Sequence, residues 1–492
     1  MSNRSSLPPI DATVGEAQQW LADGHCTSRQ LIDGYLEFLE GGGRELNAVV
    51  EIFNESAQQA ADQSDQRRAQ GQCFGPLDGI PFTAKMNITT QLGSSDASSP
   101  MLRGFKAQED ATAVRRLRAA GAVLVGKTSC DEFAMGASNE TSSHGVVSNP
   151  WDRERVPGGS SGGSAALAGS HGWSFHLGSD TGGSIRQPAA FCNATAIKPT
   201  WGRVSRRGLI AFGSSLDQIC PIARDAVDCQ SVLQVIEGHD PLDSTSLRQS
   251  TSSQQKISQP KIGRVALISD GLGPGIDASI ASAVRSAAQQ MASQGIEIIE
   301  RSLPHLEAAN ACYQVISTAE ASSNLARYDG VHVGVRGQSE DLQQLYETSR
   351  HQGFGSEVRR RILLGTFVLS AGYQEAYYNR ALAVRDLIRQ GIDQVLEDCD
   401  ALLLPVSPFA PFPIGERIDD PLALYACDIL TVTANLAGVP ALALPCAFDE
   451  QQLPIGMQLM GAHGSDHVLL EFGQRWQCWN DEHRALPQGG TR

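Results

Sequence analysis

Apolar residues in the second half of the chain alternate between runs of strand length and an amphipathic stretch of helix length. Residues 261–268 (KIGRVALI) predict a strand, and residues 296–303 (IEIIERSL) predict another. Between them, residues 276–295 repeat apolar positions at helical spacing and carry Asp277 near the expected helix cap. This alternation of strand, helix and strand indicates α/β architecture with right-handed crossovers.

The pattern of apolar and polar residues also indicates how the chain is divided into domains. Residues 11–70 contain few turn breakers apart from the glycines at 41–43 and are expected to be mostly helical. Residues 249–259 are polar, rich in serine and glutamine, and predict a surface loop. Because residues 70–248 show no linker, we expect one large domain that spans 1–492.

Composition and charge exclude several classes of protein. The formal net charge of −15, from 39 basic and 54 acidic residues, argues against binding of the phosphate backbone of a nucleic acid by this chain alone. No apolar run reaches the ~18 residues of a membrane span, and the N-terminus lacks a hydrophobic signal core, so we expect a cytoplasmic protein without membrane contact. The 11 cysteines include no C-x-x-C pair, which argues against a disulfide framework and a metal site.

Two glycine-embedded serine clusters, at 157–166 (PGGSSGGSAA) and 179–188 (SDTGGSIRQP), indicate a hydrolase active site. Glycine lets backbone N–H groups approach a developing oxyanion, and a serine nucleophile needs a partner that removes its proton. If GGSSG were a nucleophile elbow, Ser160 would be the nucleophile and a later histidine the base. The candidates are His463, His467 and His483, none of which has a local context typical of a catalytic histidine.

A neutral lysine can replace histidine as the base. Lys85 follows an apolar run of strand length at 77–84, so a buried strand would carry its side chain into the interior. Burial can lower the pKa of a lysine from ~10.4 to about 5–6. Lys85 is therefore the candidate base.

A second motif, GAVLVGKT at 121–128, fits the P-loop expression and would imply nucleotide binding. A phosphate-binding loop follows a strand and opens a helix, whereas here a helical pattern at 110–121 comes first and AVLV itself predicts a strand. We therefore interpret Lys127 and Thr128 as the end of a buried strand.

The order of these motifs resembles that of the amidase signature family. Lys85 precedes Ser160 by 75 residues, and Ser160 precedes Ser184 by 24. Similar stretches continue at 110–136, 149–159 and 198–224, and the resemblance covers about the whole chain. It implies the amidase signature fold, an α/β fold in which helices cover both faces of a mixed central β-sheet.

The resemblance implies a triad with Ser184 as nucleophile, Ser160 as bridging serine and Lys85 as base, and a cis bond between Gly159 and Ser160. Neutral Lys85 would take the proton of Ser160 as Ser160 takes that of Ser184, whose oxygen would attack an amide carbonyl and form an acyl-enzyme.

The oxyanion hole is expected at the N–H groups of Thr181, Gly182, Gly183 and Ser184. A larger residue at position 182 or 183 is expected to crowd the substrate carbonyl.

Within the family, other stretches are similar to the glutaminase components of tRNA-dependent amidotransferases: 238–246, 320–331, 353–373 and 430–442. This likeness implies a glutaminase that releases ammonia from glutamine. Arg361 and Asp428 would bind the charged α-carboxylate and α-ammonium groups of glutamine, and Tyr313 would lie at the substrate site.

The likeness also implies partners. The B and C subunits would complete a heterotrimer that amidates glutamate or aspartate on a misacylated tRNA, and tRNA would be reached only through a partner. ATP and magnesium are expected at a partner of this chain, and no cofactor is expected in the chain itself.

Two alternatives stay open. The chain could be a stand-alone amidase, or a paralogue serving a different amide or carboxylate, because Met86, Ser99–Pro100 and Gln314 depart from the pattern of those glutaminase components. It could also be a catalytically silent assembly scaffold, which the presence of all three triad residues disfavours.

Overall fold

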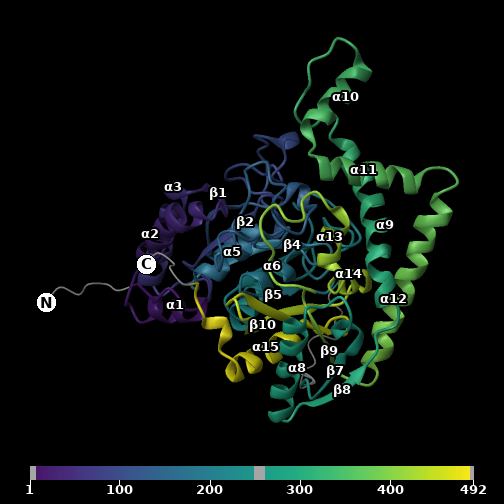
Figure 1. Ribbon diagram of the computed structural model, residues 1–492. Coiled ribbons are helices and arrows are strands. Elements are labelled where there is room, and N and C mark those ends of the chain that lie inside the picture. Colours follow the sequence, from purple (N-terminus) through teal and green to yellow (C-terminus); the bar gives the residue numbers. More distant parts are fainter. Residues whose placement is uncertain (1–6, 249–260, 488–492) are drawn as a thin grey trace.

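The computed structural model describes residues 7–248 and 261–487, and within them eleven strands form one mixed sheet (Figure 1). In spatial order they are β1 (Val49–Ile52), β3 (Val123–Thr128), β2 (Pro81–Lys85), β4 (Phe175–Asp180), β6 (Gln218–Ala223), β5 (Thr195–Lys198), β10 (Ala441–Phe448), β11 (Pro454–Gly461), β9 (Ala401–Pro405), β7 (Arg264–Ile268) and β8 (Glu297–Arg301). Strand β2 runs parallel to β3 and β4, and β7 runs parallel to β8 and β9. The other neighbouring pairs are antiparallel.

Helices cover both faces of this sheet. Along β9, Ala401 and Leu403 enter one hydrophobic cluster, whereas Leu402 and Leu404 enter another, because successive side chains point to opposite faces of a sheet. The first cluster includes residues of α1 (Val14–Ala22), α2 (Ser28–Phe38), α3 (Asn54–Ala69), α4 (Thr112–Ala119), α7 (Ala226–Ile236), α8 (Ala278–Ser293) and α15 (Asp466–Trp479). The second includes residues of α9 (Leu306–Asn324), α12 (Arg380–Leu396) and α14 (Val432–Ala437). The predicted fold class is confirmed.

The alternation predicted from the hydrophobic pattern is present as β7, α8 and β8. Asp277 occupies the N-cap position of α8, as expected, although its side chain makes no capping hydrogen bond. Strands β7 and β8 are parallel neighbours, which is the pairing that a connecting helix permits.

The N-terminal segment is only partly as predicted. It contains the helices α1 to α3, but it also contributes β1, an edge strand that pairs with β3. The glycines expected to break the chain lie instead in a π-helical turn, Leu39–Gly43. The loop expected at 249–259 lies outside the described residues, and the single domain over 1–492 stays a prediction.

The P-loop hypothesis is wrong for the reason given by the sequence. Helix α4 comes before β3, and the strand continues through Lys127 and Thr128. The Lys127 side chain is fully buried, and its Nζ lies 3.2 Å from the hydroxyl oxygens of Thr90 and Ser95. The Ile88 carbonyl and two hydroxyl groups, rather than an open phosphate cradle, surround this lysine nitrogen.

The parallel pairing of β2 with β4 positions the serine clusters. Parallel strands end at the same edge of a sheet, so Lys85, the last residue of β2, lies near the turn that follows β4. Helices α5 (Gly162–Ser170) and α6 (Arg186–Phe191) begin within the two serine clusters. On the other side of the molecule, α10 (Leu342–Gly353) projects from the body and leads into α11 (Ser356–Leu369), while α13 (Pro421–Tyr425) lies closer to the sheet (Figure 1).

Candidate active site

Lys85 is buried among hydroxyl groups. Its side chain has no exposed surface, and its Nζ lies 2.7 Å from Ser160 Oγ, 2.9 Å from Ser161 Oγ and 3.0 Å from Ser179 Oγ. Burial lowers the pKa of Lys85 below the ordinary lysine value, and nearby acidic groups oppose the shift only in part. The surroundings therefore favour the neutral amine that a base requires.

The turn before α5 presents Ser160 to this lysine. The Gly159–Ser160 peptide bond is cis, as the family resemblance implies. The Gly159 N–H donates to Gln187 Oε1 at 2.9 Å, and the Asp131 N–H donates to the Ser160 carbonyl at 3.2 Å. A Cβ atom at position 159 would lie 2.1 Å from Asp131 Oδ2, so only glycine fits at this close approach.

Ser184 joins the group through its backbone. Its carbonyl oxygen accepts a hydrogen bond from the Ser161 N–H at 3.0 Å, and the residue is 4% exposed. Among the described residues, the Ser184 hydroxyl has no hydrogen-bond partner. Lys85 and Ser160 are thus in direct contact, whereas the Ser184 hydroxyl makes no hydrogen bond to either of them.

The loop between β4 and Ser184 offers free N–H donors. In the described chain, the N–H groups of Thr181, Gly182, Gly183 and Ser184 donate to no protein acceptor. An unpaired run of backbone donors next to a serine hydroxyl is the arrangement that an oxyanion hole needs. This is where the sequence places the oxyanion hole.

The two glycines of this loop are needed for a reason that the sequence did not reveal. A Cβ atom at Gly182 would lie 2.6 Å from Tyr313 Cζ, and one at Gly183 would lie 2.2 Å from Thr431 Oγ1. Gly183 also has a φ of +145°, where other residues are strained. Crowding by the surrounding protein, in addition to any crowding of a substrate carbonyl, therefore requires glycine here.

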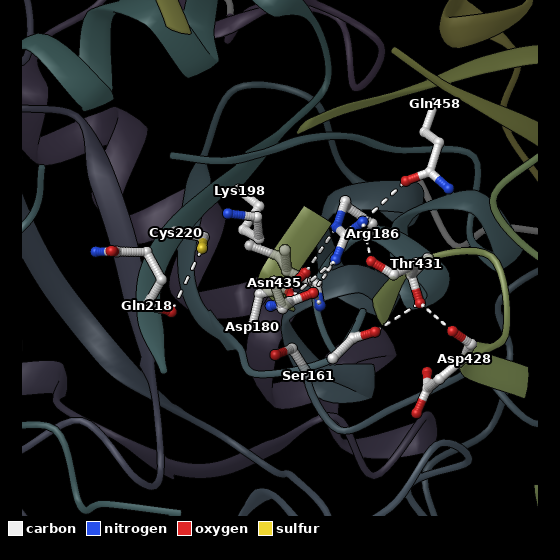
Figure 2. Close-up of polar contacts among 12 residues, drawn as sticks. Ser161, Asp180, Arg186, Lys198, Gln218, Cys220, Asp428, Thr431, Asn435 and Gln458 are labelled. Carbon is white, nitrogen blue, oxygen red and sulfur yellow. Dashed lines mark hydrogen bonds and ion pairs between the residues drawn. The ribbon is translucent and has the colours of Figure 1, made fainter. Parts of the chain in front are cut away.

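A buried charge network holds the base of the loop (Figure 2). Arg186 forms a two-pronged contact with Asp180, with Nε–Oδ2 at 3.0 Å and Nη2–Oδ1 at 3.1 Å, and both side chains are fully buried. Arg186 also donates to the Thr431 carbonyl at 3.0 Å, Gln458 Oε1 at 2.8 Å and Asn435 Oδ1 at 2.6 Å. The ends of β4 and α6 are thereby fixed to segments about 250 residues away along the chain.

Thr431 reaches the oxyanion loop directly. Its hydroxyl donates to the Gly182 carbonyl at 2.6 Å and lies 3.1 Å from the Asp428 carbonyl oxygen. Sequence reasoning identified neither Thr431 nor the Asp180–Arg186 pair. The signal that could have found the pair is its position, because both charged residues flank Ser184 in an otherwise uncharged glycine-rich segment.

Arg361 is buried, unlike the solvated helix face that three consecutive arginines suggest. Its Nε donates to Glu357 Oε1 at 2.7 Å, and its guanidinium carbon lies 5.5 Å from the Phe212 ring centre and 5.1 Å from that of Tyr425. The Tyr425 hydroxyl donates to the same Glu357 oxygen at 2.9 Å. This cage holds the cation next to aromatic faces, where cation–π contact stabilises it.

Asp428 and Tyr313 lie beside the oxyanion loop. A Cβ atom at Gly183 would be 3.1 Å from Asp428 Oδ1, and the Tyr313 ring packs on Gly182. Burial raises the pKa of Asp428 to about 8, although Arg361 acts in the opposite direction. Its Oδ1 is buried and has no hydrogen-bond partner among the described residues, so this carboxyl group is available to a ligand.

The residues that depart from the pattern of the tRNA-dependent glutaminases occupy different surroundings. Met86 is fully buried next to the base, and its N–H donates to the Thr128 carbonyl at 3.0 Å. The Ser99 hydroxyl donates to Glu132 Oε1 at 2.6 Å. Both polar atoms of the Gln314 amide are buried without a partner in the described part of the chain.

The described residues contain neither a cluster that could hold a metal ion nor a helix that could span a membrane. Within 7–248 and 261–487, no three His, Cys, Asp or Glu side chains cluster closely enough to hold a metal ion. Every helix in these ranges is too short or too polar to span a bilayer.

Comparison with known proteins agrees with the site. The family model described as Amidase matches residues 30–470. The chain is 46% identical over 477 residues to the A subunit of the glutamyl-tRNA(Gln) amidotransferase of Chloroflexus aggregans, covering 96% of this chain and 98% of the relative. It is 48% identical over 480 residues to the protein of the same name from Prochlorococcus marinus, covering 97% and 99%.

Among solved structures, the A subunit of the glutamyl-tRNA(Gln) amidotransferase of Thermotoga maritima superposes with a TM-score of 0.76 at 35% identity, covering 94% of each chain. Near-complete coverage at this identity means that the whole architecture, and not a shared motif alone, is common to these proteins. The chain belongs to the amidase signature family.

Proposed function

We propose that this chain is the glutamine-hydrolysing subunit of an amidotransferase that amidates misacylated Glu-tRNA(Gln) or Asp-tRNA(Asn). The name shared by its curated relatives supports this assignment. The observation that carries the chemistry is the contact of 2.7 Å between the buried Lys85 Nζ and Ser160 Oγ.

The proposed reaction begins with a proton relay. Neutral Lys85 takes the Ser160 proton while Ser160 takes that of Ser184, and the Ser184 oxygen attacks the amide carbonyl carbon of glutamine. The negative charge that develops on the carbonyl oxygen is stabilised by the free N–H groups of residues 181–184. The relay then returns a proton to the amide nitrogen, the C–N bond breaks, and ammonia leaves.

The second half of the reaction releases the acid. Water gives a proton to the relay and attacks the ester carbonyl carbon on Ser184. The tetrahedral intermediate collapses, the Ser184 oxygen recovers a proton, and glutamate is released. Both halves use the same base and the same donors, as expected of covalent catalysis by an activated serine.

Glutamine recognition is proposed for two buried residues, one basic and one acidic, of which the acidic one binds in its ionised form. The α-carboxylate would pair with the planar guanidinium of Arg361, which binds carboxylates in a two-pronged manner. The α-ammonium would pair with Asp428, whose Oδ1 has no partner among the described residues. Tyr313, which packs on Gly182, would line the side chain between these charged ends and the oxyanion loop.

The remaining steps are proposed for partner subunits. A B subunit would bind ATP and magnesium and activate the carboxylate on the tRNA, a C subunit would complete the heterotrimer, and ammonia would pass between subunits. The net charge of −15 supports leaving the tRNA contacts to a partner. The proposed acceptor, an aminoacyl-tRNA, gives the cytoplasm as the expected location.

The test measures ammonia release from glutamine by the purified chain, alone and co-expressed with B and C subunits, with S184A as the blank. We expect weak release by the chain alone and a clear increase with partners. Vigorous turnover of other amides without partners, with glutamine inert, would instead identify a stand-alone amidase. Absence of any Ser184-dependent turnover would identify a silent scaffold.

A further inference from the structure

Asp217, just before β6, is a buried carboxylate whose bonds converge on the active site. The residue is 3% exposed. Its Oδ1 accepts from the Thr181 hydroxyl at 2.7 Å and from the Gly213 N–H at 3.1 Å, and its Oδ2 accepts from the Phe212 N–H at 2.9 Å. Burying a carboxylate is costly unless such donors satisfy it, so all three bonds matter to the fold.

These three donors belong to the two halves of the proposed site. Thr181 begins the oxyanion loop, whereas Phe212 is one of the two aromatic rings that flank Arg361. The two segments also touch, because a Cβ atom at Gly213 would lie 3.2 Å from Thr181 Cγ2. Asp217 is therefore the side chain that ties the oxyanion loop to the wall of the proposed carboxylate pocket.

We infer that Asp217 is a positioning residue, which orients the N–H groups of residues 181–183 by holding the Thr181 hydroxyl against the Phe212–Gly213 turn. This inference rests on the proposed amide hydrolysis and adds to it a residue that does not touch substrate. Since the donors of an oxyanion hole must already point at the developing charge, a loop that is free to rotate would stabilise the transition state less.

Leucine keeps the branched shape of the aspartate side chain without its acceptors. Asparagine would not serve, because with its NH₂ group at the Oδ2 position its oxygen could still accept from both the Thr181 hydroxyl and the Gly213 N–H. D217L therefore removes all three bonds that the carboxylate accepts from Thr181, Phe212 and Gly213.

A matched control exists in the same region. Asp240 also accepts hydroxyl and backbone donors, from the Thr112 hydroxyl at 2.6 Å, the Ser205 hydroxyl at 2.7 Å and the Leu242 N–H at 3.0 Å. It is 3% exposed and makes no hydrogen bond to residues 181–184 or 212–217. D240L thus removes an equally buried carboxylate that does not contact the oxyanion loop.

The experiment measures the second-order rate at which a serine-directed fluorophosphonate labels Ser184 in the full chain, because the phosphoryl oxygen of the probe occupies the oxyanion hole. We expect D217L and T181V each to slow labelling by about tenfold or more, since the loss of a complete donor costs ~10²–10³. If both act through one contact, the double variant should be no slower than the slower single variant. T181S should recover most of the rate lost in T181V, and D240L should stay within about twofold of wild type.

Labelling of D217L at the wild-type rate, or losses that multiply in the double variant, would overturn the inference. If D217L fails to fold, the comparison of T181V with T181S decides, because equal rates for the two would also overturn it. Failure of the wild-type chain to label at Ser184 at all would instead overturn the proposed hydrolysis, whatever the behaviour of the variants.

Discussion

The fully buried Arg186–Asp180 pair allows a stability prediction with a worked magnitude. In R186M, five donated hydrogen bonds disappear, and Asp180 keeps only the Asn435 Nδ2 donor at 2.8 Å and the Ile185 N–H at 3.4 Å. Removing one partner of a buried ion pair costs about 3–5 kcal/mol because the other charge is left uncompensated.

This cost converts into a shift of the melting temperature. The entropy of unfolding is ~2.1 cal/mol/K per residue, or about 1 kcal/mol/K for a chain of 492 residues. R186M should therefore lower the Tm by roughly 3–5 °C in differential scanning calorimetry. The control is R44M, which breaks the exposed Arg44–Glu40 pair, and such pairs contribute only about 0–1 kcal/mol, so its Tm should change by less than about 1 °C.

A double variant tests whether the uncompensated charge of Asp180 causes the loss of stability in R186M. D180N/R186M removes the stranded charge as well as the cation, so it should destabilise the chain less than the sum of the two single variants. An R186M protein that melts within about 1 °C of wild type, or single-variant effects that simply add, would refute the reasoning.

The other predictions concern the reaction. K85M should reduce glutamine hydrolysis by ~10²–10⁴ while glutamine binding measured by calorimetry persists, and a variant that still turns over would exclude Lys85 as the base. Because the base must be neutral and burial lowers the pKa of Lys85, kcat/KM should rise with pH and level off below the ordinary lysine value of ~10.4; a rise that continues past that value would contradict the assignment. The pKa of Asp428 is raised to about 8, so this group is protonated below that pH and ionised above it. The KM for glutamine should accordingly fall as the pH rises through about 8, and D428N should weaken this dependence if the carboxylate binds the ammonium group. G182A should lower turnover because the added Cβ would lie 2.6 Å from Tyr313 Cζ; turnover at the wild-type rate would show that the loop accommodates the methyl group.

Much of the fold could be predicted because the relevant signals are local. The runs around Lys85 and Lys127 are apolar over strand length and bounded by turn residues, and both are buried strands in the structure. Strand β1 could not be predicted in this way. It has only four residues, Val49–Ile52, and its pairing partner β3 begins about 70 residues later, so nothing nearby in the sequence indicates the pairing.

Some residues of the proposed site could likewise be predicted from the sequence, and others could not. The glycine and serine clusters are continuous in sequence, and family order identified Lys85, Ser160 and Ser184. The groups that hold them in place come from distant segments: Thr431 contacts Gly182 across 249 residues, and Asp217 contacts Thr181 from the far side of another turn. Long-range side-chain contacts leave no spacing pattern, so they emerge only from the structure.

Arg361 shows how burial changes the meaning of a pattern. In sequence it is the last of three arginines on a helix, which is typical of a solvated face. In the structure Arg360 is exposed, whereas Arg361 is buried against Glu357, Phe212 and Tyr425. The helical turn of 100° per residue separates the two side chains, and only the packing of α11 decides which one faces inward.

The central claim is that Ser184 carries the glutamyl group during turnover. The most direct test quenches the co-expressed complex with acid during glutamine hydrolysis and measures the mass of the peptide that contains Ser184. The account predicts that this peptide gains the mass of one glutamyl group as an ester, and that the adduct is absent from S184A and K85M. Ammonia release with no adduct on Ser184, or with an adduct on Ser160 instead, would contradict it.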